Sequence, residues 1–154
     1  MAAGDKKAPI RVSPQPRFDW TEVVKLGNAE LDEQHERMFL LADALVESLV
    51  YSGADNVGRD PSRNLQALID FSYEHFRFEE DLMRSAGYPG TEQHANEHSE
   101  LLVEIAKHRY EFQLGHPNVA HVMGYMRNWI NRHIDAADRE LVVWLRSHLP
   151  PAGG

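Results

Sequence analysis

Four stretches of the chain place apolar or inward-facing residues at alternating spacings of three and four, the period of an amphipathic α-helix. They span about residues 28–51, 61–86, 94–112 and 118–149. Asp60 followed by Pro61 is a strong helix-start signal, and the Gly- and Pro-containing segments AGYPG and GHPN interrupt the pattern. No segment alternates with period two over a strand length. The pattern predicts an all-α fold, an antiparallel up-down-up-down four-helix bundle.

The length of 154 residues suits one domain. We expect a flexible N-terminal arm over residues 1–17, the bundle over 18–149 and a loose tail over 150–154. The opening MAAGDKKAPIRVSPQP lacks the apolar segment of a signal peptide, and no apolar run approaches the ~20 residues that cross a bilayer. We therefore expect a cytoplasmic protein that does not insert into a membrane.

Composition narrows the chemistry. The chain has no cysteine, which excludes disulfides, thiolate metal sites and cysteine nucleophiles. Its formal charge of -8 opposes the phosphate backbone, so nucleic acid is not an expected partner. The nine histidines are unusual for this length. Their arrangement therefore decides what they do.

The predicted core contains polar residues, which are costly to bury unless they are hydrogen-bonded or bind a metal. They are His35, His75, Glu79, His94, His98 and His133, joined by Asp138 near the end of the chain. Counted outward from the middle of each interhelical break, these residues lie at matching distances, and antiparallel neighbours rise together at ~1.5 Å per residue. All seven should share one layer of the bundle. Independent core histidines have no reason to coincide in this way, so the layer predicts a polynuclear metal site.

His133 and Asp138 are five residues apart, which on a regular α-helix would aim them about 140° apart. The inward stripe also slips by about one residue between them. We therefore predict a π-bulge within residues 133–138. A rival stripe through Ala137, Leu141 and Trp144 leaves the inward role of Asp138 open, and Glu80 and Asp135 are the nearest rivals for the two carboxylate positions.

Five imidazoles and two carboxylates suit iron, zinc, copper or nickel better than calcium or magnesium. Seven ligands exceed the needs of one ion. Two ions bridged by both carboxylates is the economical arrangement, and it leaves little net charge to bury. The paired Glu-x-x-His motifs of ferritin-like di-iron proteins are absent from the sequence.

Four motifs resemble the hemerythrins, in particular the single-domain bacterial ones called bacteriohemerythrins. The motifs are LDEQH at 31–35, HFRFEE at 75–80, HANEH at 94–98 and NWINRHIDAAD at 128–138, and the resemblance covers roughly residues 18–146. It implies a non-haem centre of two iron ions with a bridging oxo or hydroxo group, which binds dioxygen reversibly. It also implies that His94, His98 and His133 hold one iron, His35 and His75 hold the other, and Glu79 and Asp138 bridge them.

The iron with two histidines would keep an open position, where dioxygen should bind. An apolar lining would keep water and anions away from it. The candidates lie within one turn of the ligands and are Met38, Phe76, Trp129, Ile130 and Ile134, for which plain core packing is the alternative. Leu141 stands where the family often has tyrosine, which bears on the tuning of the site rather than on iron binding.

The leading functional interpretation is a dioxygen carrier, store or delivery protein without enzymatic activity. A di-iron enzyme acting on peroxide or nitric oxide, or an oxygen- or redox-sensing module, are the alternatives. The short flanks of the bundle favour a stand-alone carrier over a sensor, and the sequence identifies no protein acceptor of dioxygen.

The remaining polar residues are expected to have other roles. His108 is interpreted as a core or bundle-end histidine, and His116, His121 and His148 as helix-end residues. A further set is expected on the solvated exterior, namely Glu33, Glu80, Asp81, Glu97 and Asp135.

Overall fold

The computed structural model describes residues 25–50, 60–116 and 118–148. Its regular structure in these ranges is entirely helical, as predicted. The helices are α1 (Ala29–Val50), α2 (Pro61–Ala86), α3 (Thr91–Gln113), α4 (Val119–His133), the π-helix η1 (Ile134–Asp138) and α5 (Arg139–His148). The expected N-terminal arm and C-terminal tail lie outside the described residues.

The ends of α2 follow from local chemistry. The Asp60 carboxylate accepts a hydrogen bond from the Ser62 backbone N–H at 2.9 Å, and Pro61 occupies the first turn, where no backbone donor is needed. At the other end Gly87 adopts a left-handed conformation with φ of 71°, and its N–H bonds to the last turn of the helix. This residue makes the sharp turn into α3.

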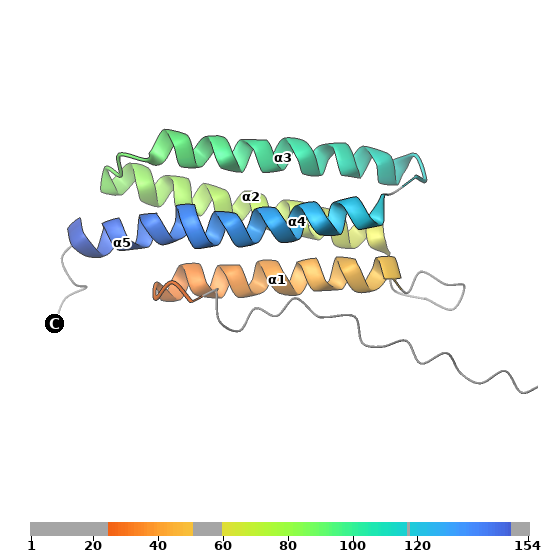
Figure 1. Cartoon of the computed structure of the whole chain (residues 1–154), viewed down its shortest axis with the longest axis horizontal. Coiled ribbons are helices and arrows are strands. Elements are labelled where there is room, and N and C mark those ends of the chain that lie inside the picture. Colours follow the sequence, from red (N-terminus) through yellow and green to blue (C-terminus); the bar gives the residue numbers. More distant parts are fainter. Residues whose placement is uncertain (1–24, 51–59, 117, 149–154) are drawn as a thin grey trace, which may run out of the picture.

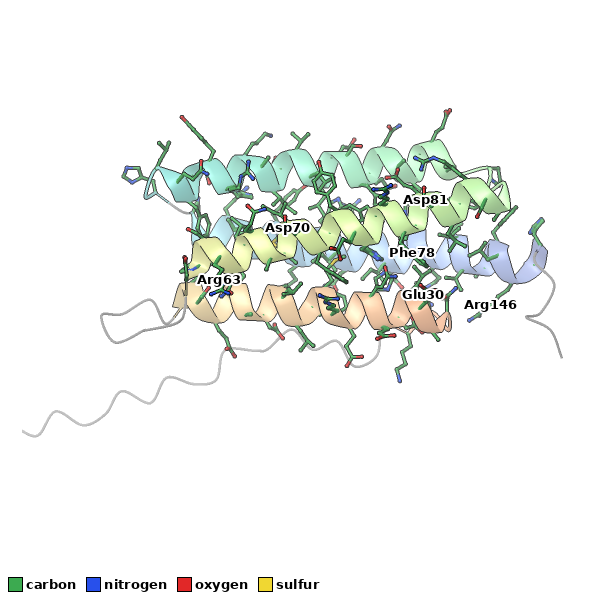
Figure 2. The ribbon with its side chains drawn as sticks, turned by 180° about the vertical axis from the view of Figure 1, so that it is seen from behind. Glu30, Arg63, Asp70, Phe78, Asp81 and Arg146 are labelled. Atoms are coloured by element: carbon green, nitrogen blue, oxygen red, sulfur yellow. The ribbon has the colours of Figure 1, made fainter. Side chains whose placement is uncertain are left out.

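The helices form a four-helix bundle in which α4, η1 and α5 make up the fourth, continuous segment. Figure 1 shows α1, α2, α3 and this last segment lying side by side. Arg146 of α5 donates a hydrogen bond to the Leu26 carbonyl at 2.6 Å, which ties the end of the fourth segment to the start of α1 (Figure 2). The charged residues Glu30, Asp70 and Asp81 point away from the bundle in the same view.

The core is built from the predicted stripes. Leu31, Leu68, Leu101 and Val122 are all fully or almost fully buried in one large apolar cluster. A smaller cluster near the α2–α3 turn contains Met83, Tyr88, Leu141 and Leu145. Glu79 of α2 and Asp138 of η1 come about one turn before Met83 and Leu141, so the polar layer adjoins this smaller cluster.

The predicted distortion of the last helix is confirmed. Residues Ile134–Asp138 form a π-helix, and Asp138, Leu141 and Leu145 are buried while Ala137 is only half-buried. The wider π-turn absorbs one extra residue, which lets His133 and Asp138 face the same interior. Of the two rival stripes, the one through Asp138 is the buried one.

Among the described residues, no helix is long and apolar enough to span a membrane.

Candidate metal centre

The seven polar residues predicted from the sequence meet in the middle of the bundle. All are buried, and they fall into two groups whose nitrogen and oxygen atoms lie within 4.8 Å of one another. The groups are Glu79, His94, His98, His133 and Asp138 on one side, and His35, His75, Glu79 and Asp138 on the other. The two carboxylates belong to both groups, whereas each histidine belongs to one.

Glu79 presents a different oxygen to each group. Its Oε1 lies 3.5 Å from His75 Nε2 and 3.9 Å from His35 Nε2. Its Oε2 lies 3.1 Å from His98 Nε2 and 3.5 Å from His94 Nε2. The carboxylate therefore stands between the two groups.

Asp138 repeats this division from the opposite helix. Its Oδ2 lies 3.0 Å from His35 Nε2, while its Oδ1 lies 3.0 Å from His94 Nε2 and 3.1 Å from His133 Nε2. A carboxylate that offers one oxygen to each of two sets of imidazole nitrogens has the geometry of a bridging ligand.

Three polar side chains orient the histidines from behind, and sequence reasoning missed this role. They are Gln34, which accepts from His75 Nδ1 at 2.9 Å, Glu80, which accepts from His98 Nδ1 at 3.3 Å, and Glu97, which accepts from His133 Nδ1 at 2.9 Å. Each holds the Nδ1 proton outward and leaves the Nε2 lone pair facing inward, the usual arrangement of metal-binding histidines. Glu80 and Glu97 were expected on the solvated exterior; both are partly exposed, but each also contacts a buried histidine.

The chemistry of the donor set fits bound metal. In their metal-binding form, with one proton on Nδ1 facing a carboxylate, His98 and His133 would carry lone pairs on Nε2 atoms that are only 3.0 Å apart. Two lone pairs this close repel unless a cation lies between them. Bonds of ~2.1 Å to one six-coordinate ion would place neighbouring ligand atoms about 3.0 Å apart.

Buried oxygens give a second test of the fit. Both oxygens of Glu79, both of Asp138 and both ring nitrogens of His35 are buried without a hydrogen bond among the described residues. Buried polar groups are costly when unpaired, because each has lost its hydrogen bonds to water. Cations at the centre would satisfy the four carboxylate oxygens and the Nε2 atom of His35, which faces them.

The electrostatics indicate the same need for positive charge. Burial opposes a charge on His94, but the nearby carboxylates of Asp138 and Glu79 outweigh it and raise the pKa of His94 to about 9. Burial lowers the pKa of His75 to about 4. Burial by itself would raise the pKa of Asp138, yet His133 and other nearby histidines hold it well below its usual value. The carboxylates thus stay ionised and attract positive charge.

The rivals for the two carboxylate positions are excluded by their surroundings. Asp135 is 60% exposed and pairs with Arg139 at 2.9 Å. Glu80 pairs with Arg84 at 2.7 Å and reaches only the outer nitrogen of His98. Neither approaches the interior of the centre.

Most of the predicted lining residues are buried, and the aromatic ones contact ligand histidines. Met38, Ile130 and Ile134 are buried in the large apolar cluster. The ring of Phe76 stacks on His98 with centroids 4.0 Å apart and lies 5.6 Å from the ring of His75. A role for these residues in lining a dioxygen site stays a prediction.

Trp129 and two surface hollows lie next to the group that contains His94, His98 and His133. The indole stacks on His133 with centroids 4.3 Å apart and is half-buried. A surface hollow of about 460 Å³ is lined by Trp129, His133 and Glu97, and a second of about 160 Å³ by His94 and Glu97. Glu97 therefore stands between solvent and this half of the centre.

A family comparison agrees with this geometry. The family model described as "Hemerythrin HHE cation binding domain" matches residues 26–145, which is most of the chain. The chain belongs to the hemerythrin family. Membership implies non-haem iron as the metal of this family's centre, and the buried His, Glu and Asp clusters are able to hold metal.

Named relatives are of moderate similarity over most of the hemerythrin domain. Bacteriohemerythrin of Stenotrophomonas maltophilia is 26% identical over 130 residues, covering 84% of this chain and 82% of the relative. Bacteriohemerythrin of Ralstonia nicotianae is 28% identical over 138 residues, covering 89% and 95%. A hemerythrin-like protein of Naegleria gruberi is 28% identical, covering 81% and 90%. A crystal structure of a leucine-to-phenylalanine mutant matches with a TM-score of 0.65 at 26% identity, covering 73% of this chain and 83% of that one.

Proposed function

We propose that this hemerythrin-family protein binds two iron ions and takes up dioxygen reversibly, as a carrier or store rather than an enzyme. In this proposal His94, His98 and His133 hold one iron, His35 and His75 hold the other, and Glu79 and Asp138 bridge them. The observation that carries the proposal is the asymmetry of the two groups. Three histidines serve one side and two serve the other, while both carboxylates are shared.

The unequal number of histidines distinguishes the half of the centre that would bind dioxygen. Three imidazoles and two carboxylate oxygens, with a bridging oxo or hydroxo group, would fill the positions of an iron ion on one side. The side with His35 and His75 has one imidazole fewer and so keeps a position free for dioxygen. Two iron ions, when bound, supply two electrons to dioxygen and recover them on its release.

The protein's own side chains would make this uptake reversible. His35 is fully buried, and the buried Met38, Ile130 and Ile134, each within one turn of a ligand along its helix, offer apolar side chains that would exclude water. Excluding water and anions hinders the loss of a reduced oxygen species. Gln34 fixes the ring of His75 through its Nδ1 proton, which keeps the free position in place.

The test is an optical titration of iron-loaded, anaerobically reduced protein with dioxygen, followed by removal of the gas under argon. We expect a new absorption band that appears with dioxygen and disappears under argon over repeated cycles. A one-way change to the oxidised form, with peroxide consumed or released, would contradict the carrier and favour the enzyme acting on peroxide or nitric oxide.

Trimming the apolar lining should shorten the life of the dioxygen complex. Ile130 is 2% exposed in the large apolar cluster. We expect Ile130→Ala to keep the full iron content and to autoxidise several-fold faster, because a smaller side chain admits water to the centre. Autoxidation is followed as loss of the dioxygen-dependent band with time. Ile105→Ala, in the same cluster but far along α3, is the control, and equal acceleration in both variants would refute a lining role for Ile130.

Removing an orienting carboxylate should weaken iron binding without abolishing it. Glu97 accepts from His133 Nδ1, and partners of this kind are typically worth about 10–100-fold in metal affinity. We expect Glu97→Ala to show a loss in that range when iron is withdrawn by a competing chelator. Glu100→Ala, an exposed glutamate one turn away beside the same hollow, should match the wild type. Equal affinities for all three proteins would show that Glu97 does not position His133.

Several expectations stay predictions at this point. They are the up-down-up-down order of the helices, the division into arm, bundle and tail, the cytoplasmic location, and the lack of a nucleic-acid partner. Cell fractionation with an antibody against the chain would test the location directly.

A further inference from the structure

A second cluster of metal-binding side chains lies at the far end of the bundle. Glu104 and His108 are one turn apart on α3, and His121 comes from the first turn of α4. Each offers an atom within 4.8 Å of the others. His108 is ten residues beyond His98 on α3, about 15 Å along the helix axis. The cluster is therefore separate from the iron centre.

His108 supplies a fixed and unsatisfied ligand atom. Its side chain is 3% exposed, and its Nδ1 lies 3.3 Å from Glu111 Oε2, which directs the ring proton outward. Its Nε2 is buried with no hydrogen-bond partner among the described residues. That nitrogen faces Glu104 Oε1 at 3.8 Å, too far for a hydrogen bond. A lone pair buried at this cost points to a ligand.

Glu104 divides its two oxygens between a lysine and the histidines. Its Oε2 accepts from Lys107 Nζ at 2.8 Å, and this bond lowers the pKa of the carboxyl. Its Oε1 is 3.8 Å from His108 Nε2 and 3.9 Å from His121 Nε2. The free oxygen thus stands between two imidazole nitrogens at nearly equal distances.

His121 gives the cluster an open side. Its side chain is 57% exposed, and its ring centroid is 5.2 Å from that of His108. Ligand atoms around one tetrahedral ion with bonds of ~2.0–2.1 Å lie about 3.3–3.4 Å apart, so small rotations of His121 and Glu104 would complete the site. Both side chains have solvent on one side and are able to make them, while His108 stays fixed.

We propose that Glu104, His108 and His121 bind one divalent ion of the zinc type, independently of the iron centre. Two imidazoles and one carboxylate with a remaining position for water suit Zn²⁺, Ni²⁺ or Cu²⁺ rather than Ca²⁺ or Mg²⁺. The ion would fasten the last part of α3 to the first turn of α4. It stabilises this end of the bundle by favouring the folded state, in which alone the three ligands are assembled.

The test uses iron-loaded full-length protein equilibrated with Zn²⁺, freed of loose metal on a desalting column and analysed for zinc and iron together. We expect wild type to gain one Zn²⁺ per chain with no loss of iron, and its melting temperature to rise with Zn²⁺. His121→Ala and Glu104→Gln should bind Zn²⁺ at least tenfold more weakly and lose that rise. His148→Ala, an exposed histidine in α5, should behave like wild type.

Three results would overturn the site. The first is that wild type takes up no zinc. The second is equal uptake by all four proteins, which would place the zinc elsewhere. The third is zinc uptake matched by iron loss, which would place the zinc in the iron centre. Because His121 is exposed and Glu104→Gln preserves side-chain size, both variants should fold, which circular dichroism verifies. The result does not depend on whether the iron centre binds dioxygen.

Discussion

Replacing Asp138 with alanine is expected to lower the bound iron from about two ions per chain to less than about one. Like Glu79, Asp138 presents one oxygen to each half of the centre, with Oδ1 near His94 and His133 and Oδ2 near His35. Its loss removes one ligand from each half and one negative charge from a fully buried site. Two cations held close together then lack the charge that offsets their repulsion.

Asp135→Ala is the matched control, because it removes the same side chain three residues earlier in the same π-helix. Asp135 is exposed and accepts hydrogen bonds from Arg139 on the outside of the bundle, so iron content should stay at the wild-type level. Iron is measured per chain after reconstitution, with circular dichroism to verify that both variants are helical. Full iron content in Asp138→Ala would show that this carboxylate does not bridge the metals.

The helices could be predicted from the sequence because their signals are local. The Asp60–Pro61 start and the Gly87 stop act within one turn, and the three-four spacing of residues such as Leu65 and Leu68 needs no knowledge of the other helices. The π-helix was predictable for a related reason. A regular helix could not bury both His133 and Asp138, because five residues are more than one helical turn. The helix therefore had to widen between these two residues.

The candidate site was predictable only in part. The inward histidines were visible because polar residues are unexpected on an apolar stripe. Glu80 and Glu97 lie beside that stripe, where charged residues normally face water, and nothing local marks them. The missing signal was their position: Gln34, Glu80 and Glu97 each adjoin a ligand on their own helix and contact a histidine of a neighbouring helix.

The cluster at the far end of the bundle shows the same limit. His108 and His121 were separately interpreted as a core residue and a helix-end residue, and both descriptions agree with their burial and exposure. Their approach to Glu104 depends on how α3 and α4 are rotated about their axes. Helical periodicity identifies an inward face but does not fix the contacts at its edges, so this grouping required the three-dimensional structure.

Removing the metal should markedly lower the thermal stability of the protein. Without a cation, the oxygens of Glu79 and Asp138 and the Nε2 atom of His35 remain buried and unpaired. A ligand that binds only the folded state at about 1,000 times its dissociation constant stabilises it by about 4 kcal/mol. For a chain of this size each kcal/mol shifts the melting temperature by about 2–4 °C. We therefore expect the iron-loaded protein to melt about 8–16 °C above the chelated protein by calorimetry.

The variant His35→Leu separates this metal effect from general changes in packing. Leucine is an apolar side chain that fills much of the same buried space and has no ring nitrogens, so the half of the centre that includes His75 loses one of its two imidazoles. The iron-dependent rise in melting temperature should fall to less than about half of the wild-type rise. His148→Ala, which changes an exposed histidine, should retain the full rise. An undiminished rise in His35→Leu would contradict the assignment, because iron would then stabilise the protein without the His35 ligand.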